Sequence, residues 1–214
     1  MIREKWVHAL LGIAVTLFVV APAVAQEAEA EAAAAEETEA ATTHDQEVMM
    51  AKLAEYATPG EAHERLARQA GEWDYTMKWW TSPDAQPEES SGTLSASMTM
   101  DGRFLVENWQ GTAMGQPFTG QGVTGYDNFE QEYVSTWIDN MGTGIMVSRG
   151  RYDPEQDALV MSGTFDDVMT GEKDKSMRGI TKLLDDNTLH LEMYTAGPEG
   201  TEFKVGEIHA VRRP

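Results

Sequence analysis

The hydrophobic pattern of this chain changes its period once, near residue 72. Before that point apolar residues recur at helical spacing over residues 46–57, and a second short helical segment runs up to Gly71. After it, apolar and polar residues alternate, first over residues 72–79 and again over 93–100. The pattern predicts two short helical segments followed by half-buried strands.

The second helical segment has a recognisable start. Thr58 can act as the N-cap, Pro59 suits the first helical position, and Glu61 follows the cap by three residues. This spacing predicts a capping box at Thr58.

Turn signals such as Asp101-Gly102 and Pro198-Glu199-Gly200 recur at hairpin spacing after residue 72. About ten strands separated only by such turns form an antiparallel meander, and pairing the last strand with the first protects both edges. We therefore expect an all-β domain, closed into a barrel, in preference to a two-sheet sandwich. The expected strands cover residues 72–81, 92–100, 103–110, 117–127, 132–139, 144–152, 158–166, 175–184, 188–197 and 201–212.

The first 25 residues have the features of a cleavable signal peptide. Arg3 and Lys5 precede an apolar run from Ala9 to Val20, and Ala23-Val24-Ala25 matches a signal peptidase site. The run is shorter than the ~20 residues that cross a bilayer, which argues against an uncleaved anchor. We expect cleavage after Ala25, a periplasmic or secreted location, and no stable membrane association of the mature protein.

Residues 26–47 form an acidic spacer rich in Ala and Glu. They contain no Lys or Arg and no apolar stripe, so we expect a solvated, disordered tether before a β-barrel domain over 48–214. The whole chain has a formal net charge of −20, which disfavours nucleic acid and anionic lipid as partners. The oligomeric state is left open.

Motifs of common enzymes and metal sites are largely missing from the chain. Cysteine is absent, which removes thiol chemistry and Cys-ligated metals. Residues 120–125 match G-x-G-x-x-G, but the following residues indicate a strand end and not a helix, so we reject a nucleotide loop. The histidines lack metal-ligand spacing. We expect no cofactor, no metal and no catalytic residue.

Candidate ligand-binding residues come from the strands. Strand methionines give an apolar wall that adapts to varied shapes, and strand tryptophans add rigid apolar surface. Arg178 depends on the register of the last hairpins: with a three-residue turn it shares the outer face with Glu192 and Tyr194, and with a two-residue turn it joins Met193 and can anchor a carboxylate. The candidate set is Trp73, Trp79, Trp137, Met161, Arg178 and Met193.

These observations favour a non-catalytic exported protein that binds or transports a small apolar ligand in the barrel. One alternative is a barrel enzyme in which Glu107 or Glu192 acts with Arg178 inside the cavity. Another is a protein-interaction module that uses the outer face or the spacer.

Four segments of the chain form a specific combination. They are Pro59-Gly60-Glu61 with His63, Leu66, Gly71 and Trp73; Asp101 to Glu107; Gly125-Tyr126-Asp127; and Trp137 to Gly144. Together they resemble a bacterial family known as domain of unknown function 1579. The resemblance implies a lipocalin-like (calycin) β-barrel and assigns no activity.

Overall fold

The structure is a computed structural model of the chain, and it describes residues 43–197 and 199–214. The predicted signal peptide and most of the predicted spacer lie outside the described residues. Residues 43–57 are helical, so the helix begins three residues before the predicted start. Within the described part of the chain, no helix is long and apolar enough to cross a membrane.

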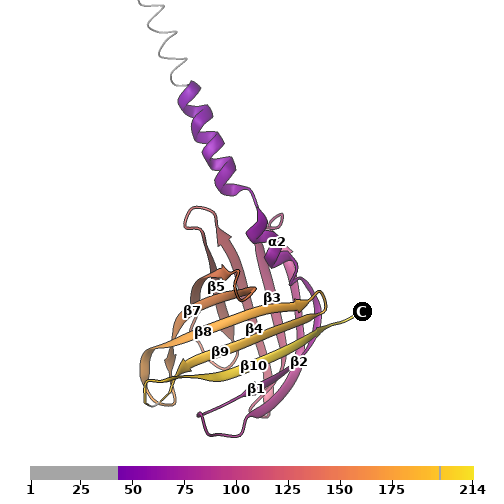
Figure 1. Cartoon of the computed structure of the whole chain (residues 1–214), viewed down its shortest axis with the longest axis vertical. Helices are drawn as coiled ribbons and strands as arrows, with labels where there is room; N and C mark the ends of the chain where they lie inside the picture. The colour runs from indigo at the N-terminus through magenta and orange to yellow at the C-terminus, as the bar shows by residue number, and fades with distance from the viewer. Residues whose placement is uncertain (1–42, 198) are drawn as a thin grey trace, which may run out of the picture. The chain divides into compact units, whose positions relative to one another are not determined.

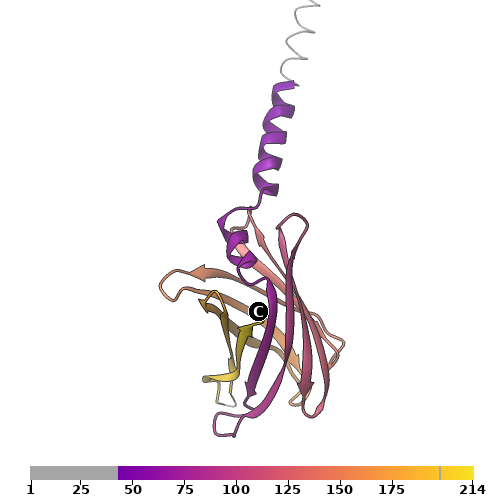
Figure 2. The same cartoon turned by 90° about the vertical axis from the view of Figure 1, so that its right-hand side faces the viewer.

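Residues Ala54–Pro214 form one compact unit that contains a closed ten-stranded barrel (Figures 1 and 2). Each strand pairs antiparallel with the next, and β1 also pairs with β10. The all-β class, the strand order and the closure predicted from the sequence are confirmed. The strands are β1 Gly71–Trp79, β2 Glu88–Thr99, β3 Phe104–Ala113, β4 Gln116–Asp127, β5 Glu132–Asp139, β6 Met146–Asp153, β7 Ala158–Asp167, β8 Glu172–Asp185, β9 Thr188–Ala196 and β10 Glu202–Arg212.

The short helix α2, Glu61–Ala67, begins differently from the prediction. Its N-cap is Gly60, whose backbone N–H donates to Nδ1 of His63 at 3.0 Å. The hydroxyl of Thr58 donates to the carbonyl of Ala54 at 2.5 Å, one turn back in the preceding helix. The predicted cap at Thr58 is therefore wrong, because its side chain satisfies the end of one helix and not the start of the next.

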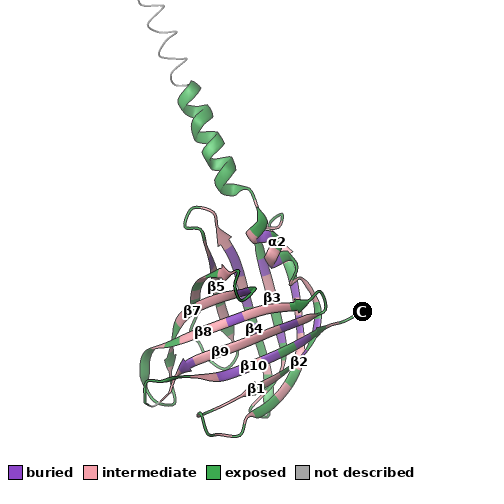
Figure 3. Ribbon diagram, viewed as in Figure 1, coloured by how far each residue is buried: buried purple, intermediate pink, exposed green. Residues whose placement is uncertain are grey.

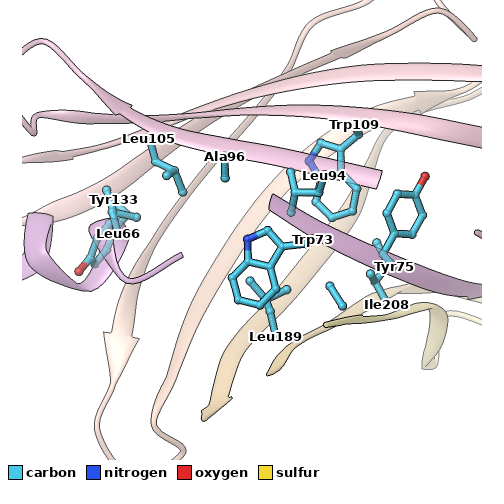
Figure 4. Packing of buried hydrophobic residues seen from close by; sticks show 11 residues of the cluster. Leu66, Trp73, Tyr75, Leu94, Ala96, Leu105, Trp109, Tyr133, Leu189 and Ile208 are labelled. Carbon is cyan, nitrogen blue, oxygen red and sulfur yellow. The ribbon is translucent and has the colours of Figure 1, made fainter. Parts of the chain in front are cut away.

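Helix α2 covers the end of the barrel at which β1 begins. Leu66 is buried in the core beside Tyr133, whose hydroxyl donates to the carbonyl of Ala62 at 3.1 Å (Figure 4). Trp73, at the start of β1, is completely buried, and its indole N–H donates to the carbonyl of Gln69 at 3.0 Å. These contacts fasten the helix to the barrel wall.

Arg212, on the last strand, completes this end. Its guanidinium lies 4.1 Å from the centre of the Trp73 ring and donates to the carbonyls of Arg68, Ala70 and Asp186. A Cβ at Gly71 would lie 2.2 Å from the guanidinium, so glycine is needed for this close approach. The first and last strands are thereby joined through side chains as well as through the sheet.

The strands alternate between an inner and an outer face, and Figure 3 shows buried and exposed positions alternating along them. The cross-strand register aligns one inner row of alternating small and large side chains. Placing a small residue beside each large one lets neighbouring strands pack without crowding the lumen. The row is Gly150, Met161, Gly179, Met193, Gly206 and Trp79.

Candidate functional site

The two walls of the barrel lumen are filled to different extents. On β1, β2, β3 and β10 many inner side chains are buried, including Trp73, Leu94 and Leu105, with no more than 1% of each exposed. On β6, β7 and β8 every inner position is only partly buried. The space inside the barrel therefore borders β6 to β8.

Gly179 on β8 marks this space. It pairs with Met161 on β7 and with Met193 on β9, so the two methionines flank it on the inner face. A Cβ at Gly179 would meet only Cδ1 of Leu191, at 3.8 Å. The structure thus brings two of the sequence-predicted ligand residues to the edge of an unfilled region.

Trp137 lies on β5, the strand next to β6. Its ring lies over Gly120, where a Cβ would approach ring atoms to 2.4 Å, and it stacks with Phe118 at 6.4 Å between centroids. Its indole N–H donates to Asp139 at 2.8 Å. The G-x-G-x-x-G run lies within β4, so its glycines leave room for aromatic rings and form no nucleotide loop.

Glu107 on β3 is the charged side chain of greatest interest on the inner face. Protein surrounds it, and desolvation by burial raises the pKa of its carboxyl from 4.5 to about 7. Part of the residue nevertheless remains accessible to solvent. A side chain with both properties faces a part of the barrel interior that solvent reaches.

The surroundings of Glu107 offer its carboxylate no partner among the described residues. Its cross-strand neighbours are Ala96 and Gly122, and its inner-face neighbours along β3 are Leu105 and Trp109. A Cβ at Gly122 would lie 3.2 Å from the Glu107 carboxylate. The acid therefore lies over bare backbone, with apolar and aromatic groups around it.

Trp109 adds a second unpartnered polar group beside Glu107. The indole nitrogen is buried and has no hydrogen-bond partner among the described residues. Its ring is 5.0 Å from that of Tyr75 and 6.2 Å from that of Trp137. In Figure 4 the nitrogen lies on the side of the ring toward Ala96, the cross-strand partner of Glu107. A buried donor without an acceptor costs about 1–3 kcal/mol, so the group calls for an acceptor.

The other predicted ligand residues lie elsewhere. Trp79, near the far end of β1, is partly exposed and packs over Gly206 beside Met193. Trp73 is sealed under α2 and Arg212, so it supports the closed end and presents no surface to the lumen.

Arg178 is on the outer face, so it does not line the lumen as the candidate set proposed. It pairs with Tyr194, stacks on that ring at 4.4 Å, and makes two hydrogen bonds to Glu202. An irregularity between Leu183 and Asp185 sets this register. Arg178 and Glu107 therefore occupy opposite faces of the wall, and the two-residue enzyme site does not form.

Glu192 is also on the outer face, in a cluster that could in principle hold a metal ion. His190, Glu192 and Glu207 place ligand atoms within 4.8 Å of one another. The ammonium of Lys204 already bridges both carboxylates, 3.2 Å from Glu192, and holds the pKa of Glu207 below its usual value. A cation would have to displace that lysine.

Two depressions lie away from Glu107. A cavity of about 60 Å³ at the α2 end is lined by Arg65, Tyr133 and Leu183, among others. A wider, open depression of about 440 Å³ on the outside of β1, β2 and β10 is bordered by Thr76 and His209. Neither contains the unpartnered polar groups of the lumen.

Glu107 was predicted as a site residue only for the enzyme alternative, and Trp109 and Gly179 were not predicted as parts of a site. Alternation alone places all three on the inner face, which is a usable signal. The alternation does not show which residues on neighbouring strands lie opposite these three.

Comparison with solved structures shows the fold. The chain is similar to the crystal structure of Rv2717c from M. tuberculosis, with a TM-score of 0.57 and 15% identity over 73% of this chain and 100% of that one. It is also similar to the S-type phycobiliprotein lyase CPES from Guillardia theta, with a TM-score of 0.53 and 12% identity over 72% of this chain and 93% of the lyase. These likenesses support a lipocalin-like barrel.

A search of curated proteins finds no match. A family model described as "Protein of unknown function (DUF1579)" matches residues 58–212, which include all ten strands. The chain therefore belongs to this family, as the resemblance in its motifs had implied.

Proposed function

We propose that this protein binds a small, mostly apolar ligand in the lumen of its barrel, as a non-catalytic carrier. The observation that carries the proposal is the unfilled inner wall of β6 to β8, where Gly179 leaves space between Met161 and Met193. Flexible thioethers beside a gap adapt to apolar ligands of varied shape. The likeness to the lyase shows a shared fold and contributes no ligand identity.

The lumen meets the general requirements of a small-molecule site. Such sites are concave and mostly apolar, with a few polar groups that fix orientation. Here Trp137, Met161 and Met193 supply apolar surface, while Glu107 and the indole N–H of Trp109 are the polar groups. Ligand contact with these groups would relieve the cost of leaving them unpaired.

Filling the space tests the proposal. Retinol and pyrene, two neutral apolar probes, should bind saturably and quench tryptophan emission in the wild-type chain. Gly179→Leu should weaken this binding at least about tenfold, because its side chain occupies the space between the methionines. Ser162→Leu is the matched control, since Ser162 is exposed on the outer face of the adjacent strand.

Two results would count against the carrier. One is unsaturable or absent binding of both probes to wild-type protein that melts cooperatively. The other is equal affinity in Gly179→Leu and Ser162→Leu, which would place the probes outside the lumen.

The proposal also includes export. Cleavage after Ala25 would release the mature chain with Gln26 at its N-terminus, in the periplasm or outside the cell. Intact-mass measurement of the protein from its native compartment tests this step, and retention of residues 1–25 would contradict it.

A further inference from the structure

Several charged side chains on the inner face of the barrel have partners, whereas Glu107 does not. Lys175 contacts Asp167 at 2.9 Å, with about 15% of each side chain exposed. Arg212 is held by backbone carbonyls at the closed end. Asp139 accepts an indole N–H. Glu107 has neither a counter-ion nor a hydrogen bond among the described residues.

An unpaired carboxylate in an apolar lumen has a strong preference for particular ligands. A second negative charge would be repelled at close range in surroundings of low dielectric constant, whereas a cation would be attracted. The long-range field acts in the same direction, because the chain has a net charge of −20. Both effects disfavour fatty-acid-like ligands and favour basic ones.

The geometry leaves room for such a contact. Cross-strand from Glu107 is Gly122, which presents backbone without a side chain, and the ring of Trp137 lies beside it. Aromatic faces attract cations held close to them, so the Trp137 ring, which contacts Trp109, can lie against a charged nitrogen at the carboxylate. Trp109 is more than nine-tenths buried, and its unpartnered indole N–H points toward Ala96, the cross-strand partner of Glu107. This N–H is a hydrogen-bond donor, so its ligand partner would be an oxygen or another acceptor, and not the cation.

We infer that the ligand of this lumen is a mostly apolar molecule with one basic nitrogen, which is bound as a cation by Glu107 beside the rings of Trp109 and Trp137. A hydrogen-bond acceptor elsewhere on the ligand would satisfy the indole N–H of Trp109. The inference rests on the proposed carrier function and specifies the chemical class of its ligand.

Three probes with the same alkyl chain test how the charge of the ligand's head group affects binding. Octylamine, 1-octanol and octanoate share an eight-carbon chain and are cationic, neutral and anionic near neutral pH. Titration into the full mature chain, followed by tryptophan emission and calorimetry, should show octylamine binding at least about tenfold tighter than 1-octanol. Octanoate should bind most weakly of the three.

Substitution of the acid then assigns the preference to Glu107. Glu107→Gln keeps the size of the side chain and removes its charge, so it should reduce the affinity for octylamine about tenfold or more and leave that for 1-octanol nearly unchanged. Glu192→Gln, on the outer face, is the control and should leave the order of the three probes as in wild type.

A measurement on the wild-type chain tests the same contact without depending on whether the variant folds. Binding of octylamine should convert a protonated Glu107 to carboxylate, and the infrared difference spectrum should lose a protonated-carboxyl band. The band should persist with 1-octanol.

The outcomes separate the two proposals. Binding of 1-octanol or octanoate as tight as that of octylamine, or an amine preference that survives in folded Glu107→Gln, overturns the ligand class and leaves the carrier function standing. Absence of saturable binding by all three probes overturns the carrier function and this inference together.

Discussion

The two walls of the barrel are built from the same alternating pattern but fold to different packing densities. On β1, β2, β3 and β10 many inner side chains belong to the buried core, and Trp73 and Ala210 are completely buried. On β6, β7 and β8 the inner positions include methionine, serine and glycine, and none is fully buried. One wall contributes much of the buried core, and the other keeps inner surface accessible to solvent.

This division explains how a small domain without cysteine combines stability with an accessible interior. Stability depends on close-packed apolar surface, which the first wall and the α2 cap supply. Binding depends on space that side chains do not fill. Because close packing is concentrated on one wall and open space on the other, the interior can stay accessible with little loss of stability.

Truncating one residue on each wall tests most directly whether the two walls contribute differently to stability. Trp73→Ala should lower the free energy of unfolding by about 3–5 kcal/mol, because it removes a completely buried indole and the support of Arg212. Met161→Ala should cost about 1 kcal/mol, since its side chain is only partly buried and borders space. Urea unfolding measures both. Equal losses would mean that the walls do not differ in packing.

The pH dependence of stability tests Glu107, the unpartnered acid on β3. Folding raises the pKa of Glu107 from 4.5 to about 7, so the group contributes stability that is fully present below pH 4.5 and is lost as pH rises through about 7. The loss should be at most about 3–4 kcal/mol, because the pKa of the carboxyl rises from 4.5 to about 7 on folding.

The matched variant isolates this contribution. His63 has its pKa lowered by burial and therefore changes stability in the opposite direction, with a loss as pH falls. The difference between wild type and Glu107→Gln, measured at about pH 5 and pH 8, cancels the effect of His63. A difference that does not change with pH would show that the Glu107 carboxyl is well solvated.

Alanine substitution at two inner glycines compares the free space around Gly120 with that around Gly179. Gly120→Ala places a Cβ 2.4 Å from the Trp137 ring and should cost about 1–3 kcal/mol through overpacking. Gly179→Ala meets no atom closer than 3.8 Å and should stabilise by about 0.5–1 kcal/mol, because alanine restricts the unfolded chain. Thermal unfolding of both variants gives the sign, and destabilisation by Gly179→Ala would indicate a filled lumen.

The smallest effect is expected outside the barrel. Arg178→Gln breaks two hydrogen bonds to Glu202 and a stacking contact with Tyr194, but both charges are partly exposed. The cost to stability should stay below about 1 kcal/mol, and ligand affinity should not change. A loss of affinity in this variant would place the binding surface on the outer face and favour the interaction-module alternative.

Much of the fold was predictable from local sequence. The change from helical to alternating spacing near residue 72 and the turn residues between strands predicted the ten strands and their order, because both signals depend only on neighbours along the chain. The exception at Thr58 is informative: two helix ends compete for one hydroxyl, and the sequence does not show which end is satisfied.

The candidate site was predictable only in part. Alternation placed Trp137, Met161 and Met193 on strands with an inner face, and the structure brings the two methionines together around Gly179. The face occupied by Arg178 could not be decided, because one bulged residue between Leu183 and Asp185 changes the register of the whole hairpin.

The sequence by itself determined an alternating meander long enough to close, a strongly acidic chain and a set of inner-face aromatic and methionine residues. Only the tertiary structure decided that Glu107 lies opposite Ala96 and Gly122 and so has no partner among the described residues. The physical reason is that the environment of a side chain in a barrel comes from strands distant in sequence. Their alignment depends on turn lengths and bulges summed over the sheet, and not on the period of any one strand.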